Sequence, residues 1–581
     1  MQRRPGKGAH IAPPLGTPVN TDSEKHPSRL NQKTLGVTNR IWIILTLFII
    51  LVLFTKSILP TDNTTPRHRL IHSDLKPKNY LNITDGDTVP FPFCPALGPG
   101  DELATKYDPM TLAKTRFHQG SGARVQRVLS RALAGQPVTI SVIGGSVSAC
   151  HGAGDDPLSP TCWPSRFFNW WNEVFPHPAS ELTNGAMRRT NSAYFSFCNA
   201  HHVPDVTDLV IVELDVDDEA DPSTMENFEL LIRSLLLRPD QPAVVILGHF
   251  SPQIQNTYGF LGPDHWHSAV AQFYDVPHVS VKPLLYAKYM EDPEAVSNKY
   301  YADPVLANSA GHEVIADVLI SYFETRICAA WAAATGTSSE LLMSPGMPAS
   351  FGTGENLKQP KDAKGLFGGV AQRVGAAGGP IFEPIKNFAA QKDNNQPAEQ
   401  RQVENPTNPK QLYPHLRVPP TRMNARSSAD SDEEVEPFCA SANDLINPLP
   451  SSIFSGTGWS VFHPPPGSAE LSSHAHYWYS TLPTSKLRIG IQVAAGDIGV
   501  YYLKEPRATV GVGSAVECWV DDNYQGAVVI ENSHNIGESL PALELIDHHV
   551  ASGSHYVECQ LMGEEDDRNV VPFKIIGIFA T

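Results

Sequence analysis

A serine on a glycine turn is the first feature of this sequence that could do chemistry: a short apolar run ends in Ile143-Gly144-Gly145-Ser146. A serine in such a turn can attack a carbonyl carbon if a base takes its proton, and backbone N–H groups freed by the turn can stabilise the oxyanion. Gly-Ser turns are common, so this feature alone is weak evidence for a nucleophile. Three later segments strengthen it: Thr183-Asn184-Gly185-Ala186, the run from Leu209 to Asp218, and Tyr300-Tyr301-Ala302-Asp303 with the following Gly311-His312.

The segments named above lie in a region where predicted strands and helices alternate, and these elements must position them. Short β-branched apolar runs predict buried strands, and the amphipathic stretches between them predict helices. The strands are expected at 138–143, 209–214, 243–247 and 279–281, and the helices at 167–175, 225–237 and 311–327. This pattern is typical of a flavodoxin-like, three-layer α/β domain with a parallel sheet. Ligands bind such sheets beyond the carboxyl ends of the strands, where Ser146 and Asp217 are expected.

The chain of 581 residues is long enough for more than one domain. The α/β pattern occupies residues 137–331, after a stem and lead-in at 60–136. Residues 332–430 lack hydrophobic periodicity and are rich in Gly, Pro, Gln and Asn, which predicts a disordered linker. Short strands and turns alternate over residues 431–581, which predicts an all-β sandwich as an accessory domain.

The N-terminal segment predicts a membrane anchor. Residues 1–40 are basic and aperiodic, as expected of a disordered cytoplasmic tail, and residues 41–59 are apolar enough to span a bilayer as one helix. The long basic region and the lack of a small-residue cleavage site favour an uncleaved signal anchor over a signal peptide. We therefore expect a single-pass type II membrane protein of the Golgi or cell surface, glycosylated at the sequons of Asn63 and Asn82.

All eight cysteines follow the expected anchor, so disulfides are expected in an oxidising compartment. We expect Cys150 to pair with Cys162 and Cys518 with Cys559, although spacing alone does not fix the pairing. Metal-ligand spacing of the CxxC type is absent from the sequence, so we expect no metal and no cofactor. The net charge of −17 without a basic cluster in the predicted domains excludes nucleic acid as a partner.

In order and spacing, the four chemical segments resemble the sequence blocks of the SGNH (GDSL-like) hydrolase superfamily, over about residues 137–331. The sequence is most similar to fungal membrane-anchored proteins of the capsule-associated type. Those proteins typically carry a β-rich partner domain with two characteristic strands, here Cys518 to Asp522 and Gly553 to Cys559. The resemblance implies a serine esterase or O-acyltransferase that acts on acyl groups of a cell-wall or capsular glycan.

The resemblance also implies roles for single residues. Ser146 matches the nucleophile, the N–H groups of Ser146 and Gly185 match oxyanion donors, and Asp303 matches the acid of the catalytic pair. Asp217 stands where the family has an asparagine as the third oxyanion donor. An ionised carboxylate would repel an oxyanion, so Asp217 could serve there only if burial keeps it protonated. Leu306 stands where the family has its catalytic histidine.

Because position 306 is leucine rather than histidine, the sequence does not identify the catalytic base. His312 matches a second family histidine and is the predicted substitute, with Asp303 to orient it, although a helix-start histidine that binds nearby backbone is the simpler interpretation. His249, after the strand at 243–247, is another candidate, but a polar residue lining the crevice is again simpler. The alternative function is a catalytically impaired pseudoenzyme that binds glycan or a partner enzyme, and a purely structural stem is a third hypothesis.

Overall fold

The computed structural model describes the following parts of the chain: residues 33–34, 37–39, 41–48, 75–82, 89–335, 372–375, 416–423, 437–442, 454–464, 472–494, 496–564 and 570–581. Residues 1–70 and 71–581 form two separate units. The first holds the short strands β1 (Lys33–Thr34) and β2 (Val37–Thr38) and a helical stretch over 41–48. The rest of the predicted anchor and Asn63 lie outside the described residues. Among the residues that the structure describes, no helix is long and apolar enough to span a bilayer.

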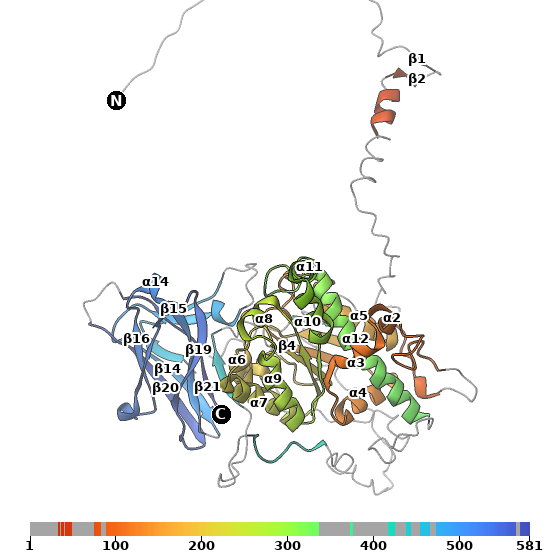
Figure 1. The fold of residues 1–581 in the computed structure, drawn as a ribbon. Coiled ribbons are helices and arrows are strands. Elements are labelled where there is room, and N and C mark those ends of the chain that lie inside the picture. Colours follow the sequence, from red (N-terminus) through yellow and green to blue (C-terminus); the bar gives the residue numbers. More distant parts are fainter. Residues whose placement is uncertain are drawn as a thin grey trace, which may run out of the picture. The chain divides into compact units, whose positions relative to one another are not determined.

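The second unit contains a seven-stranded sheet with the order β3-β8-β7-β6-β4-β5-β9. Figure 1 labels β4 of this sheet and the helices packed around it. The five strands from β8 to β5 are parallel, and the two edge strands are antiparallel to their neighbours. The strands are β3 (Arg116–His118), β4 (Thr139–Gly144), β5 (Glu181–Asn184), β6 (Leu209–Glu213), β7 (Ala243–Gly248), β8 (His278–Ser280) and β9 (Gln372–Gly375). This confirms the predicted α/β domain with a parallel sheet.

Helices cover both faces of this sheet, which is why β6 and β7 are buried along their whole length. Successive residues of β4 point to opposite faces: Val142 lies in one apolar cluster, with α4, α5 and α12, and Ile143 in the other, with α6, α7 and α9. The helices are α2 (Glu102–Tyr107), α3 (Pro109–Lys114), α4 (Ala123–Leu133), α5 (Trp163–Val174), α6 (Ser192–Cys198), α7 (Pro222–Leu237), α8 (Pro252–Tyr258), α9 (Pro263–Phe273), α10 (Lys282–Glu291), α11 (Pro293–Tyr300) and α12 (Ser309–Ala334).

Most of the predicted linker at 332–430 lies outside the described residues. Residues 332–334 are the last residues of α12 rather than linker. Two later segments are described and contact the α/β domain. β9 pairs with β5 at the edge of the sheet. Residues 416–423 lie along α4 and α7, where Arg124 donates to Leu416 O and Arg233 Nη1 donates to Pro419 O at 2.7 Å.

The C-terminal part is all-β, as the strand pattern predicts, and consists of two antiparallel sheets apart from one short parallel pair, β15 with β18. Apolar side chains of both sheets, such as Ile489, Val557 and Ile575, form its own core. The strands are β10 (Phe438–Ser441), β11 (Phe454–Thr457), β12 (Ser460–Phe462), β13 (Tyr477–Ser480), β14 (Lys486–Val493), β15 (Ile498–Pro506), β16 (Ala515–Val520), β17 (Val528–Glu531), β18 (Ser533–His534), β19 (Leu540–Asp547), β20 (Gly553–Leu561) and β21 (Phe573–Ala580).

Four disulfides fix the second unit. The two expected pairs, Cys150–Cys162 and Cys518–Cys559, are both confirmed. Cys94–Cys328 ties the lead-in to α12. Cys198–Cys439 joins α6 of the α/β domain to β10 of the β domain, and aromatic contacts surround this link, with Phe197 of α6 stacked on Phe579 of β21 at 5.1 Å between ring centroids. The two domains therefore share a covalent and an apolar junction.

Candidate functional site

Ser146 lies at the carboxyl end of β4, in the turn that the sequence predicts. Two backbone bonds hold the turn: Gly145 N donates to Glu213 O at 3.1 Å, and Met187 N donates to Gly144 O at 3.0 Å. A Cβ on Gly145 would lie 1.9 Å from Asp217 Oδ2. Glycine is therefore required at position 145 because Asp217 reaches across it to Ser146.

The hydroxyl of Ser146 is held from two sides. Its Oγ donates to Asp217 Oδ1 at 2.7 Å and accepts the backbone N–H of Arg189 at 2.9 Å. The backbone N–H of Ser146 donates to Asp217 Oδ2, also at 2.7 Å. One carboxylate thus accepts both the N–H and the O–H of the serine, and the Ser146 side chain is 6% exposed.

Asp217 is placed by the turn that follows β6, in which the N–H groups of Asp217 and Asp218 both donate to Leu214 O. Desolvation raises the pKa of the Asp217 carboxyl to about 6, and the nearby Asp218 adds to the rise. The two hydrogen bonds from Ser146 and the charge of Arg189 oppose it. The carboxylate is therefore ionised above about pH 6 and accepts hydrogen bonds, which differs from the donor role that the family asparagine implies.

A buried cluster of Asp215, His267 and Asp218 holds this turn against α9. His267 Nδ1 lies 2.7 Å from Asp215 Oδ1, and its Nε2 lies 2.9 Å from Asp218 Oδ2. Burial disfavours a charged ring, but the hydrogen bonds with Asp215 and Asp218 outweigh it and raise the pKa of His267 to about 10. The cluster therefore contains an imidazolium between two carboxylates, and it fixes the residues on either side of Asp217.

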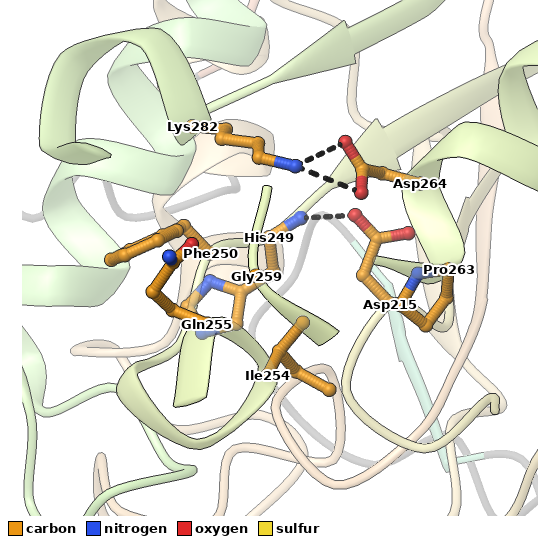
Figure 2. A pocket seen from close by; sticks show the side chains of 9 residues that line it. All are labelled: Asp215, His249, Phe250, Ile254, Gln255, Gly259, Pro263, Asp264 and Lys282. Atoms are coloured by element: carbon orange, nitrogen blue, oxygen red, sulfur yellow. Dashed lines mark hydrogen bonds and ion pairs between the residues drawn. The ribbon is translucent and has the colours of Figure 1, made fainter. Parts of the chain in front are cut away.

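A small pocket lies beside this cluster, at the carboxyl ends of β6 and β7 (Figure 2). His249 N donates to Asp215 Oδ2 at 2.9 Å, and Lys282 Nζ pairs with Asp264 at 2.9 Å. Burial lowers the pKa of His249 to about 3, so its ring is neutral. The pocket is lined by Asp215, His249, Phe250, Ile254, Gln255, Gly259, Pro263, Asp264 and Lys282. Ser146 does not line this pocket, and no hydrogen bond joins His249 to Ser146 in the described part of the chain.

The predicted pair of Asp303 and His312 is not brought together. Asp303 is exposed, and its Oδ1 accepts the N–H groups of Val305 and Leu306 at 2.8 and 2.7 Å. His312 is buried at the start of α12, where its Nδ1 accepts the N–H of Trp163 at 3.3 Å. Burial lowers the pKa of His312 to about 3. In the described residues no hydrogen bond joins Ser146, Asp303 and His312 into a triad, and His312 instead binds nearby backbone.

The N–H groups that are predicted to bind the oxyanion donate to other acceptors in this structure. Gly185 N donates to Val142 O at 2.9 Å, between β5 and β4, and Ser146 N donates to Asp217. Asp217 itself is an acceptor. The oxyanion roles of these three residues thus stay predictions, and the N–H of Arg189 is the backbone donor that the structure places at Ser146 Oγ.

Sequence reasoning missed the residues around Arg189. Arg188 forms a backbone bridge with Ser472, and Arg189 Nη1 lies 3.4 Å from Glu538 Oε2, so the β domain contacts the segment beside Ser146. The Arg188 side chain also contacts His151, which pairs with Asp155 in the loop closed by Cys150–Cys162. The long-range contacts of Arg188 and Arg189 left no local signal in the sequence.

No family model and no curated protein matches this chain. Among solved structures, a two-domain esterase (CEX) active on acetylated mannans, co-crystallised with mannopentaose, is similar at 17% identity, with a TM-score of 0.51 over 81% of this chain and 97% of that one. A second structure of an esterase with the same description matches at 16% identity and a TM-score of 0.51, over 81% of this chain and 98% of that one. The chain therefore shares the fold of these two-domain proteins.

Proposed function

We propose that this protein is an SGNH-type carbohydrate esterase or O-acyltransferase that acts on acyl groups of a cell-wall or capsular glycan. The observation that carries the proposal is the position of Ser146, whose hydroxyl lies between a carboxylate acceptor and a backbone N–H at the carboxyl end of a central strand. A serine held in this way has an acceptor for its proton, as a nucleophile requires. The shared fold with an esterase active on acetylated mannans agrees with a glycan ester as the substrate.

In the proposed reaction Ser146 Oγ attacks the acyl carbonyl and forms an acyl-enzyme, which water or a second sugar hydroxyl then resolves. The developing oxyanion needs N–H donors. The N–H of Arg189 donates to the attacking oxygen in this structure. The N–H groups of Ser146 and Gly185, which the resemblance implies as oxyanion donors, are bound to Asp217 and to Val142 O.

The proposed setting of the reaction is the lumen of the Golgi or the cell surface, with residues 41–59 as a type II membrane anchor. The four disulfides within residues 94–559 agree with an oxidising compartment. Asn82 ends a 3-10 turn at Tyr80–Asn82 and is exposed, which suits a glycosylation site.

A second candidate function is glycan binding without turnover. It is favoured by the lack of a histidine base at the site within the described residues. The buried Leu306 stands where the family has its catalytic histidine, and His312 Nδ1 accepts the backbone N–H of Trp163. A protein of this kind would keep the crevice and the two-domain fold but would bind an acylated glycan or a partner enzyme without cleaving an ester.

Acetate release from a panel of acetylated glycans, acetylated mannan among them, separates these functions. We expect the full-length protein to release acetate and Ser146→Ala to lose at least about 10³-fold of that activity. Ser130→Ala is the matched control, because this hydroxyl donates to Gln126 O within α4 and is remote from the site. Glycan binding without acetate release in the unmodified protein would instead support the second function.

A further inference from the structure

Three histidines of the α/β domain come into question as the base for Ser146. His312 accepts the N–H of Trp163, His151 contacts Asp155 and Arg188, and His249 lines the small pocket. Within the described residues none of the three is hydrogen-bonded to Ser146 Oγ. The acceptor of this hydroxyl is the carboxylate of Asp217.

We propose that Asp217 is itself the general base, which takes the proton of Ser146 Oγ directly in place of the histidine that the chain lacks at Leu306. This inference rests on the proposed function and names the catalytic residue that the function needs. It also gives a reason for the change from asparagine to aspartate, because an amide oxygen in the same place would accept the hydrogen bond but could not take the proton.

The geometry meets the first requirement for a base. A base must lie within hydrogen-bond reach of the proton it removes, about 2.6 to 3.2 Å between heavy atoms. Asp217 Oδ1 lies 2.7 Å from Ser146 Oγ, and the second bond, from Ser146 N to Oδ2, fixes the carboxylate in that orientation. Gly145 makes this approach possible, because any side chain at position 145 would overlap Asp217.

The charges around Asp217 meet the second requirement, a proton affinity suited to neutral pH. Asp218 is its nearest acidic neighbour, but it binds the His267 imidazolium and the N–H of Ser192. Glu213 lies under the serine turn and accepts the hydroxyl of Ser148 at 2.6 Å. Burial raises the pKa of Glu213 to about 8, so it is mostly neutral at pH 7.

A cation also lies near the carboxylate, the guanidinium of Arg189, which is exposed and pairs with Glu538. Desolvation of Asp217 outweighs this cation, and the pKa of about 6 follows. Asp217 is therefore mostly ionised at pH 7, as a base must be, and is a stronger base than an exposed aspartate.

The proposed step conserves atoms and charge. The Oγ–H bond of Ser146 breaks as Oγ bonds to the acyl carbon, the proton moves to Asp217 Oδ1, and the carbonyl π electrons move onto the oxyanion. Collapse of the intermediate breaks the bond to the sugar oxygen, which takes the proton from Asp217. Water or a second sugar hydroxyl then gives its proton to Asp217 and attacks the acyl-enzyme, and Asp217 returns that proton to Ser146.

The test compares full-length wild type with Asp217→Asn, which installs the family residue and keeps the shape of the side chain. The readout is the rate of labelling of Ser146 by a fluorophosphonate, which requires no knowledge of the glycan. We expect Asp217→Asn to be labelled at least about 10²-fold more slowly, since a general base typically contributes 10²- to 10⁴-fold. Asp221→Asn is the matched control, because Asp221 is the N-cap of α7 and asparagine caps a helix as well as aspartate does.

Two further measurements sharpen the test. The labelling rate of wild type should rise with pH with a midpoint near 6, because the ionised carboxylate is the active form. In Asp217→Ala the space left by the carboxylate should admit formate, and added formate should restore part of the rate. This rescue distinguishes a base from a residue that only shapes the turn, because a merely misfolded variant would not respond.

Equal or faster labelling of Asp217→Asn would overturn the proposal and would favour the oxyanion-donor role for position 217. Absence of labelling in folded wild type would also overturn it, because Ser146 would then not be activated by any base. Fast, Asp217-dependent labelling without acetate release from any glycan would leave the base assigned and reject the proposed substrate, so the two proposals fail in different ways.

Discussion

Replacement of His267 by glutamine tests the buried cluster that holds Asp217 in place. His267 is fully buried on α9 and contacts Asp215 and Asp218 through its two ring nitrogens at 2.7 and 2.9 Å. Asp215 and Asp218 are 1% and 3% exposed. Glutamine can still donate a hydrogen bond to one carboxylate, but it carries no charge, so His267→Gln removes the cation and leaves two acidic groups out of water.

The size of the effect follows from this burial. Removal of one partner of a buried ion pair typically costs about 3–5 kcal/mol, because the other charge remains uncompensated. We therefore expect His267→Gln to lower the free energy of unfolding by about 3–5 kcal/mol. We also expect slower fluorophosphonate labelling of Ser146, because Asp217 lies between the two aspartates in the same turn.

Urea denaturation of the full-length protein, followed by tryptophan fluorescence, measures this difference. His265→Gln is the matched control, since His265 is an exposed histidine on the same helix and should change stability by less than about 0.5 kcal/mol. The difference between wild type and His267→Gln should also depend on pH. With the pKa of His267 raised from 6.5 to about 10, its stabilisation is complete below pH 6.5 and is lost as the pH rises through 10.

Two results would show that the ring is neutral in the folded protein and that the cluster is an ordinary hydrogen-bond network. One is a difference of less than about 1 kcal/mol at pH 6, and the other is a difference that grows between pH 7 and pH 10. The turn that carries Asp217 would then be held mainly by its backbone bonds to Leu214 O.

Two further predictions concern the frame around the site. Joint replacement of Cys198 and Cys439 by serine should lower the free energy of unfolding by about 2–5 kcal/mol, because this disulfide links residues 241 positions apart. An unchanged urea midpoint under non-reducing conditions would show that the apolar junction alone holds the domains together. Asn308→Ala should cost about 1 kcal/mol in the same assay, since Asn308 Oδ1 accepts the N–H groups of Ala310 and Gly311 at the start of α12, and no loss would contradict its role as a cap.

The fold was largely accessible to sequence reasoning because its strands carry strong local signals. The β-branched runs at β4, β6 and β7 are buried on both faces, so each consists mostly of apolar residues and is followed by a turn. The alternation in β14, where every second residue is buried, likewise marks a half-exposed strand of the β domain. Disulfide pairing was predictable for Cys150–Cys162, within one loop, but not for Cys198–Cys439, which depends on how two domains dock.

The site was only partly predictable, because its contacts join segments far apart in the sequence. The turn position of Ser146 follows from its glycines, but its bond to Asp217 spans 71 residues and its bond from Arg189 spans 43. The sequence does not tell whether the ring of His312 reaches Ser146 or binds nearby backbone, and in the structure its Nδ1 accepts the N–H of Trp163. Likewise, His267 gives no local sign of the two aspartates that surround it.

The reaction of Ser146 with a fluorophosphonate measures whether this serine is an activated nucleophile. Intact mass and the labelled peptide would be read for full-length wild type and for Ser146→Ala. We expect stoichiometric labelling of wild type on the peptide that carries Ser146, and none on the variant. A folded wild-type protein that stays unlabelled at Ser146 would show that the serine is not activated.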